Sequence, residues 1–196
     1  MAQHIPINPP LVVAGITLPH AAILAPMAGV TDLPFRWAVR RCGGGLVVTE
    51  MVASAAVLQQ VRGEMRKLKI AALEEDPLSI QLAGWDPQIM AEAAKLCEGL
   101  GAGFIDINMG CPAKKVTGKL SGSALMREPK LAAAIMQAVK SAVGVPVTLK
   151  MRLGWDDYNL NAAEFGRIAE DTGLSMLAVH GRTRCQMYNG DADWHR

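Results

Sequence analysis

The sequence has little charge, few aromatic residues and no long hydrophobic run. Charged residues make up 19% of its 196 residues and aromatic residues 5%, whereas hydrophobic residues reach 51%. So low a charged fraction with so high an apolar content excludes a disordered chain and favours one domain with a buried core. The formal net charge of +2 neither requires nor excludes a nucleic-acid partner, because a local patch matters more than the total.

Cysteine is also scarce. The four cysteines form no Cys-x-x-Cys pair, the spacing typical of zinc ligands, so we expect no metal site. Cysteines this scattered also predict no disulfide framework, which indicates a reduced, cytoplasmic protein. We expect Cys42 and Cys97, which lie in predicted helical stretches, to be simply buried. The four are Cys42, Cys97, Cys111 and Cys185.

Targeting and membrane signals are absent as well. Residues 1–10 show no basic start followed by an apolar run, so we expect no signal peptide. No stretch approaches the ~18 uninterrupted apolar residues of a membrane-spanning helix, so we expect no membrane span.

What the chain does contain is a regular alternation of short apolar runs and longer amphipathic stretches. Each apolar run has about four or five residues, which is too short for a helix and suits a buried parallel strand. The runs predicted as strands are Ala21–Ala25, Leu46–Thr49, Leu78–Leu82, Phe104–Ile107, Val145–Leu149 and Met176–Val179.

Helix signals stand between these runs. Asp86-Pro87 is an N-cap followed by proline at the first helical position, and it predicts a helix over Gln88–Leu100. Pro129 opens a second helix over Lys130–Val143. Asn161, with Glu164 three residues later, resembles a capping box for a third helix, Ala162–Thr172, which Gly173 ends.

Repeated β-α units belong to the α/β class and fit either a doubly wound sheet or a (β/α)₈ TIM barrel. We favour the barrel, because chemically useful residues stand at or just past the end of almost every predicted strand. In a barrel all of them face one site at the carboxyl-terminal rim, whereas an open sheet gathers them at one crevice. They are Pro26, Met27, Ala28, Glu50, Gln81, Asn108, Lys150 and His180.

The six predicted strands fall short of the eight that a barrel needs. A typical barrel takes about 250 residues. We therefore expect residues 1–196 to be one catalytic-barrel domain that is truncated after about six strands, without an internal second domain.

The strongest motif is Asn108-Met109-Gly110-Cys111-Pro112, which follows the fourth predicted strand. A cysteine on such a loop can be a nucleophile, a metal ligand or a proton donor, and no second thiol is near enough to favour a metal. The adjacent proline would stiffen the loop. The lysines that follow would favour the thiolate or neutralise phosphate; they are Lys114, Lys115 and Lys119.

Two further motifs end the last two predicted strands. Lys150, in Lys150-Met151-Arg152, could pair with the electron-rich edge of a flavin or with a phosphate, or it could form a salt bridge with Glu50. His180 could donate to a carbonyl or a ring nitrogen, or be structural. Arg182 and Arg184 could contact an RNA backbone or be plain surface.

Weaker signals come from three places. The amide of Gln81 suits the edge of a heterocycle, and the small, stiff stretch Pro26–Gly29 would let a flat ligand lie close to the backbone. A basic segment could be a nucleic-acid contact or an ordinary solvated face; it contains Arg62, Arg66, Lys67 and Lys69.

Together these motifs resemble the tRNA-dihydrouridine synthases, in particular their bacterial B-like branch. The likeness rests on four stretches in the same order over residues 23–184. They are Leu24-Ala25-Pro26-Met27-Ala28-Gly29-Val30-Thr31-Asp32 with Pro34-Phe35-Arg36, then Asn108-Met109-Gly110-Cys111-Pro112, Lys150-Met151-Arg152-Leu153-Gly154 and His180-Gly181-Arg182-Thr183-Arg184. Four motifs in register are far more specific than any single pattern.

The resemblance implies an FMN-dependent enzyme that reduces uridine to dihydrouridine in tRNA with NADPH. It implies that Cys111 is the proton donor and that Asn108, Arg152 and Arg182 contact the substrate. The residues it places around the flavin are Pro26, Met27, Ala28, Gln81, Lys150 and His180. It also implies that the last two strands, the flavin phosphate site and a C-terminal helical RNA-binding domain are missing from these 196 residues.

Two alternatives remain. A dihydroorotate or dihydropyrimidine dehydrogenase would carry a similar Asn-x-x-Cys-Pro loop, although the opening motif and the stretch after His180 argue against it. A truncated, non-catalytic chain that binds RNA or another partner is the second alternative.

Overall fold

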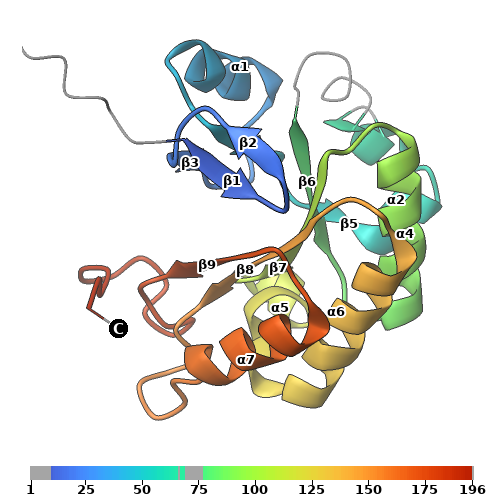
Figure 1. Ribbon diagram of the computed structural model, residues 1–196. Helices are drawn as coiled ribbons and strands as arrows, with labels where there is room; N and C mark the ends of the chain where they lie inside the picture. Colours follow the sequence, from blue (N-terminus) through green and yellow to red (C-terminus); the bar gives the residue numbers. More distant parts are fainter. Residues whose placement is uncertain (1–9, 66, 69–76, 196) are drawn as a thin grey trace, which may run out of the picture.

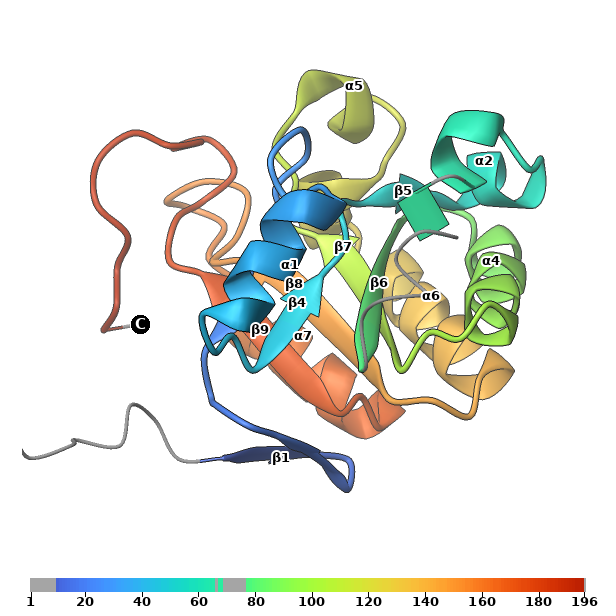
Figure 2. The ribbon, with the colours of Figure 1, turned by 90° about the horizontal axis from the view of Figure 1, so that it is seen from above.

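The computed structural model describes residues 10–65, 67–68 and 77–195. Its centre is a curled sheet whose parallel strands pair in the order of the chain (Figures 1 and 2). A short strand, β5 (Val52–Ala53), also pairs with β6. The strands of the main path are β3 (Ile23–Leu24), β4 (Leu46–Val48), β6 (Leu78–Ala83), β7 (Phe104–Met109), β8 (Val147–Arg152) and β9 (Met176–His180).

This order decides between the two predicted architectures. A doubly wound sheet reverses its strand order at a switch point, whereas within the described residues each strand of the path pairs with the next one along the chain. The sheet is therefore six consecutive strands of a barrel wall, as predicted. Within the described part of the chain, β3 and β9 are the end strands of this path.

The predicted strands are all present, with shifted ends. The first is shorter than expected, since only Ile23–Leu24 is paired. β7 and β8 are longer at their carboxyl ends, so that Asn108, Lys150 and Arg152 lie within strands rather than just past them. This matters for the site, because pairing across the sheet fixes the positions of these side chains.

Helices α4 (Pro87–Gly99), α6 (Pro129–Ala142) and α7 (Ala162–Thr172) lie along the outer face of the sheet (Figure 1). Asp86 caps α4 as predicted, because its Oδ1 accepts a hydrogen bond from the backbone N–H of Ile89 at 3.0 Å. Shorter helices occupy the connections: α1 (Leu33–Arg41), α2 (Ser54–Leu58), α5 (Lys114–Thr117) and the 3₁₀ helix η1 (Gly122–Arg127).

One predicted cap is wrong. Asn161 makes no side-chain hydrogen bond to the start of α7. Its Nδ2 instead donates to the carbonyl of Met126 at 2.7 Å, so the side chain ties α7 to η1. The predicted stop is correct, since Gly173 ends α7 in the left-handed conformation at φ 79°.

The strands alternate between an apolar outer face and a largely polar inner face. Side chains such as Ile105, Ile107 and Met109 pack outward into one core cluster with α4 and α6. Between them on β7, Asp106 and Asn108 belong to the opposite face. The inner face of this wall therefore carries the chemistry, and the outer face carries the core.

A hairpin that the sequence did not suggest covers the amino end of the sheet. Strands β1 (Leu11–Val13) and β2 (Ile16–Leu18) are joined by Ala14 and Gly15, both at positive φ, as a two-residue type I′ turn requires. The hairpin packs there in a second core cluster, formed by Val13, Leu18, Leu46 and Phe104.

The expectation for the helical cysteines is half correct. Cys97 is fully buried in α4, and burial raises the pKa of its thiol to about 12. Cys42 is exposed, because it is the C-cap of α1 rather than an interior position. None of the described helices is both long and apolar enough to cross a membrane.

Candidate active site

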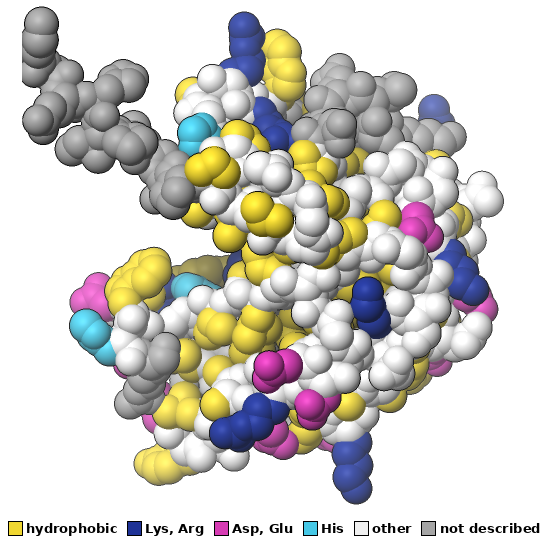
Figure 3. Space-filling model, viewed as in Figure 1, with side chains coloured by type: hydrophobic (Ala, Val, Ile, Leu, Met, Phe, Trp, Pro, Cys, Tyr) yellow, Lys and Arg dark blue, Asp and Glu magenta, His cyan; other side chains and the backbone are white. Residues whose placement is uncertain are grey.

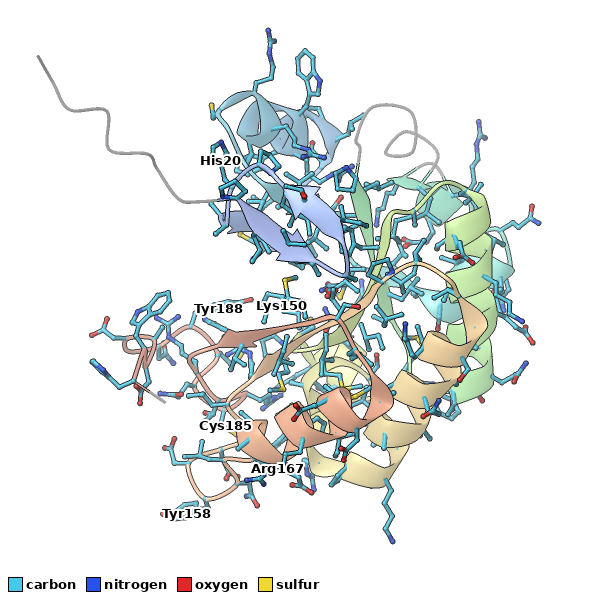
Figure 4. The ribbon with its side chains drawn as sticks, in the orientation of Figure 1. His20, Lys150, Tyr158, Arg167, Cys185 and Tyr188 are labelled. Atoms are coloured by element: carbon cyan, nitrogen blue, oxygen red, sulfur yellow. The ribbon has the colours of Figure 1, made fainter. Side chains whose placement is uncertain are left out.

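A cavity of about 630 Å³ opens at the carboxyl ends of the strands. In the space-filling view the surface is hollowed between the lobe that carries the hairpin and the lobe that carries β9 (Figure 3). Figure 4 shows Lys150 reaching into this gap, with Tyr188 at its mouth. Nine of the ten predicted site residues line the cavity: Pro26, Met27, Ala28, Gln81, Asn108, Cys111, Lys150, Arg152 and His180.

Strand register brings four of these residues together. Asn108 on β7 is paired with Lys150 on β8, and Arg152 on β8 with His180 on β9. Neighbouring residues in a parallel sheet point to the same face, so all four point into the barrel interior. The chemistry is thus carried by the ends of strands, as in other barrel enzymes.

A chain of side-chain hydrogen bonds runs along the floor of the cavity. Gln81 donates through Nε2 to Asp106 Oδ2 at 2.6 Å and accepts at Oε1 from Asn108 Nδ2 at 2.7 Å. Asn108 Oδ1 in turn accepts from the backbone N–H groups of Gly110 at 3.2 Å and Cys111 at 3.0 Å. These bonds join β6, β7 and the loop that carries Cys111 into one unit.

His180 is uncharged near neutral pH. Burial, and then the positive charges of Arg152, Lys150 and Arg182, lower its pKa to about 4. Its Nε2 lies 3.2 Å from Nη1 of Arg182, and a guanidinium can only donate. Nε2 is therefore the acceptor, and the ring proton is on Nδ1. Arg182, the one predicted residue that does not line the cavity, thus acts on it through His180.

Lys150 is a cation without a close counter-ion. Burial lowers its pKa, and the negative charge of Asp106 opposes this effect. The predicted alternative, a salt bridge with Glu50, is absent: no ion pair within 4.0 Å joins these two described residues, and Glu50 Oε1 instead accepts from the backbone N–H of Gly29 at 2.6 Å. The ammonium group of Lys150 is available to a ligand.

Arg152 is 2% exposed and holds two loops in place. Its Nε donates to the carbonyl of Gly110 at 2.8 Å, and its Nη1 donates to the carbonyls of Thr183 and Met187, both at 2.8 Å. Three donors are thus occupied by the backbone, which favours a structural role. A contact with substrate through the remaining Nη2 stays a prediction.

The loop that carries Cys111 is held on both sides. Asn108 holds the Cys111 backbone N–H, and the backbone carbonyl of Cys111 accepts from Ser123 through N at 3.0 Å and Oγ at 2.9 Å. The thiol itself is half-buried and lines the cavity. Lys114 and Lys115 are exposed on α5 and do not line it.

The opening motif forms the opposite wall. Thr31 Oγ1 accepts from the backbone N–H of Met27 at 2.9 Å and donates to its carbonyl at 3.1 Å, while Glu50 holds Gly29. These bonds fix the small residues Pro26 to Ala28 as a stiff surface along the cavity.

A cluster of cations lies on the rim loops beside the site. The guanidinium carbons of Arg127 and Arg184 lie 4.9 Å and 4.7 Å from the ring centroid of Trp155, within the range of cation–π attraction. No hydrogen bond or ion pair to another described residue engages either guanidinium. Of the predicted basic segment, Lys67 pairs with Glu64, and Arg66 and Lys69 lie outside the described residues.

Two residues at the site, Asp106 and Tyr188, were not predicted from the sequence. Asp106 is 4% exposed beneath the cavity floor, and its signal was present, since the polar residues Asp106 and Asn108 alternate with Ile105, Ile107 and Met109. Tyr188 lines the mouth of the cavity and lies 5.7 Å from the guanidinium carbon of Arg152; no pattern in the sequence singled it out.

A parallel sheet in sequential order, with a cavity of convergent polar groups at its carboxyl end, defines the class: this is the wall of a (β/α)₈ barrel. A variant of NCR from Zymomonas mobilis matches the structure with a TM-score of 0.64 at 13% identity, covering 97% of this chain and 71% of that one. At that identity the likeness concerns the fold alone, and it supports the predicted barrel.

The family follows from sequence comparison. The model of the dihydrouridine synthase (Dus) family matches residues 23–196, and the chain belongs to that family. It is 54% identical over 182 residues to a probable tRNA-dihydrouridine synthase of Rickettsia conorii, covering 93% of this chain. It is also 54% identical over 178 residues to the tRNA-dihydrouridine synthase B of Pseudomonas aeruginosa, covering 91% of this chain.

The predicted resemblance is therefore confirmed. The chain spans 55% of the length of the Rickettsia protein and 53% of that of the Pseudomonas protein.

Proposed function

We propose that this protein reduces uridine in tRNA to 5,6-dihydrouridine, with FMN as its cofactor and NADPH as the reductant. The observation that carries the proposal is a cavity in which the polar atoms of Gln81, Lys150 and His180 converge beside Cys111, in a chain of the dihydrouridine synthase family. Since tRNA is the proposed substrate, we also propose that the protein acts in the cytoplasm.

The cavity fits the ring system of a flavin. Its volume of about 630 Å³ lies within the ~300–1,000 Å³ of ligand pockets. Lys150 can only donate hydrogen bonds, and Gln81 has one N–H that Asp106 does not use. Both complement the electron-rich pyrimidine edge of an isoalloxazine. The stiff residues Pro26 to Ala28 would support the flat face of the ring.

When bound, the flavin supplies a hydride for C6 of the uracil ring. The thiol of Cys111 holds the proton that C5 requires, and the loop bonds to Asn108 and Ser123 keep that thiol at the cavity wall. The second N–H of Asn108 donates to Sδ of Met51 at 3.7 Å, a weak acceptor at the cavity wall that a uracil carbonyl would replace. The target uridine must leave its stack to enter the cavity.

The rim cations support an RNA partner. Arg127 and Arg184 are held by Trp155 rather than by acceptors, so their N–H groups are available to phosphate oxygens. The loop that carries Arg184 also carries Met187 and Tyr188, which line the cavity, so we expect the backbone beside a flipped uridine to pass near this pair of arginines.

The visible spectrum of the purified protein, together with an assay on unmodified tRNA, tests the proposal. We expect a flavin absorption band and NADPH-dependent formation of dihydrouridine. Free dihydroorotate and dihydrouracil serve as comparison substrates. Turnover of these compounds without turnover of tRNA would favour a pyrimidine dehydrogenase, and a protein that binds RNA without holding flavin would favour a binding role; either result would overturn the proposal.

A further inference from the structure

Asp106 is a buried acid to which neither the sequence motifs nor the proposed reaction assigns a role. It lies on β7 two residues before Asn108 and on the same face of the strand. It is 4% exposed and does not line the cavity. Its carboxylate accepts from Gln81 Nε2 at 2.6 Å and from Thr148 Oγ1 at 2.5 Å. A buried carboxyl group is costly unless it is paired, so its presence here calls for a physical reason.

The reason is found in the direction of the hydrogen bonds. A carboxylate can only accept, so Gln81 must turn its NH₂ group toward Asp106. Gln81 Oε1 then faces Asn108 and accepts from its Nδ2, which turns Asn108 Oδ1 toward Gly110 and Cys111. At that end the two backbone N–H groups can only donate.

This series of hydrogen bonds thus begins at an acceptor, the carboxylate of Asp106, and ends at donors, the backbone N–H groups of Gly110 and Cys111. Only one orientation of the two side-chain amides satisfies every bond. In that orientation one N–H of Gln81 remains for the cavity, next to the ammonium group of Lys150, while the second N–H of Asn108 donates to Sδ of Met51, a weak acceptor, at 3.7 Å. Reversal of either amide would leave two donors or two acceptors facing each other, at a cost comparable to a lost buried hydrogen bond.

We propose that Asp106 is a positioning residue, whose carboxylate orients Gln81 and Asn108 so that the cavity presents donors to the bound ring and the Cys111 loop is held by an acceptor. The claim that the cavity presents donors to a bound ring rests on the proposed function. The claim that an acceptor holds the Cys111 loop concerns the protein alone and needs no cofactor.

The contacts of Asp106 are those of a carboxylate, because both of its oxygens accept hydrogen bonds. Burial raises its pKa, and the hydrogen bonds from Thr148 and Gln81 and the positive charge of Lys150 offset part of that rise. Two donors and a nearby cation are the environment that a buried carboxylate needs to stay ionised.

The test uses two variants of the full-length protein and two measurements. Asp106→Asn keeps the shape of the side chain but lets it donate, so the amide order is no longer fixed. The double variant Asp106→Asn with Gln81→Glu restores an acceptor at position 81, to which the new amide at position 106 and the amide of Asn108 can both donate. It therefore rebuilds the loop anchor, but it removes the N–H of Gln81 from the cavity.

The first measurement is the rate at which iodoacetamide alkylates Cys111, followed by mass spectrometry without flavin, with the exposed Cys42 and Cys185 as internal references. We expect Asp106→Asn to change the rate for Cys111 relative to these references and the double variant to restore it.

The second measurement is FMN affinity by fluorescence titration. We expect both the single and the double variant to bind about tenfold more weakly or worse, as for the loss of a hydrogen bond that involves a charged partner. A purely structural role predicts that the two measurements recover together in the double variant.

Recovery of both measurements, or wild-type behaviour of Asp106→Asn in both, would overturn the inference. If Asp106→Asn does not fold, the double variant alone tests the inference. A folded double variant with wild-type alkylation of Cys111 and weak FMN binding is expected only if Asp106 orients both Gln81 and Asn108. A wild-type protein that binds no FMN would overturn the proposed function, and the alkylation result would still decide the role of Asp106 in the loop.

Discussion

Replacing Cys111 by alanine should separate the two halves of the proposed reaction. The variant should lose the reduction of uridine, because C5 of the ring no longer has a proton donor at the cavity wall. Loss of a general acid typically slows a reaction by ~10²–10⁴-fold, which corresponds to a barrier increase of about 3–5 kcal/mol. Oxidation of NADPH by the bound flavin should continue, because that step involves no proton for uracil.

The structure indicates that the change is local. The loop is held through the backbone N–H and carbonyl of Cys111, not through its sulfur. Alanine keeps all of these bonds, and removing one half-buried sulfur should cost about 1 kcal/mol of stability or less. The thermal midpoint and the flavin content should therefore stay close to those of the wild type.

The assay follows dihydrouridine in tRNA and NADPH consumption in the same samples. Cys185→Ala is the matched control, since Cys185 is exposed, does not line the cavity and points away from the gap that holds Lys150 (Figure 4). Full reduction of tRNA by the Cys111 variant would refute the assignment. Loss of NADPH oxidation together with tRNA reduction would show that Cys111 supports the cavity rather than the proton transfer.

Lys150→Ala should weaken the retention of FMN on gel filtration while Cys111 variants retain it; undiminished flavin content would assign Lys150 to another role. Arg127→Gln and Arg184→Gln should each weaken tRNA binding and lower its salt slope by about one, measured by filter binding, whereas the exposed Arg167→Gln on α7 should not. Because the pKa of His180 falls from 6.5 unfolded to about 4 folded, the unfolded chain binds more protons between these values, so stability should fall as pH is lowered from 6.5 to 4. His180→Gln should flatten that part of the curve in urea titrations.

Much of the fold could be predicted because the relevant signals are local. The run Leu78–Leu82 and the pair Asp86-Pro87 depend only on neighbours in the sequence, and both predictions were correct to within about one residue. The opening hairpin was missed because Ala14-Gly15 is a weak turn signal without an asparagine or aspartate. The cap at Asn161 failed because a tertiary partner, the carbonyl of Met126, took its side chain.

The cavity residues were found where a strand end and a motif coincide, as at Lys150 and His180. Their charge states could not be found in this way. The low pKa of His180 depends first on its burial and then on three cations from β8 and the loop after β9. The free ammonium of Lys150 depends on Glu50 binding Gly29 instead. Both result from which side chains meet in space, and a sequence motif does not contain that information.

The hydrogen-bonded series from Asp106 through Gln81 and Asn108 to Cys111 shows most clearly why a sequence motif cannot contain that information. Gln81 and Asp106 are 25 residues apart, and Asn108 is 27 residues from Gln81. They meet only because β6 and β7 pair with Gln81 opposite Asp106. A register shift of one residue would place the fully buried Ile80 or Leu82 opposite the carboxyl group and turn Gln81 toward the helices. The outer core of Ile80, Leu82, Ile105 and Ile107 forbids that shift, so the apolar packing on one face of the sheet determines the hydrogen-bond polarity on the other.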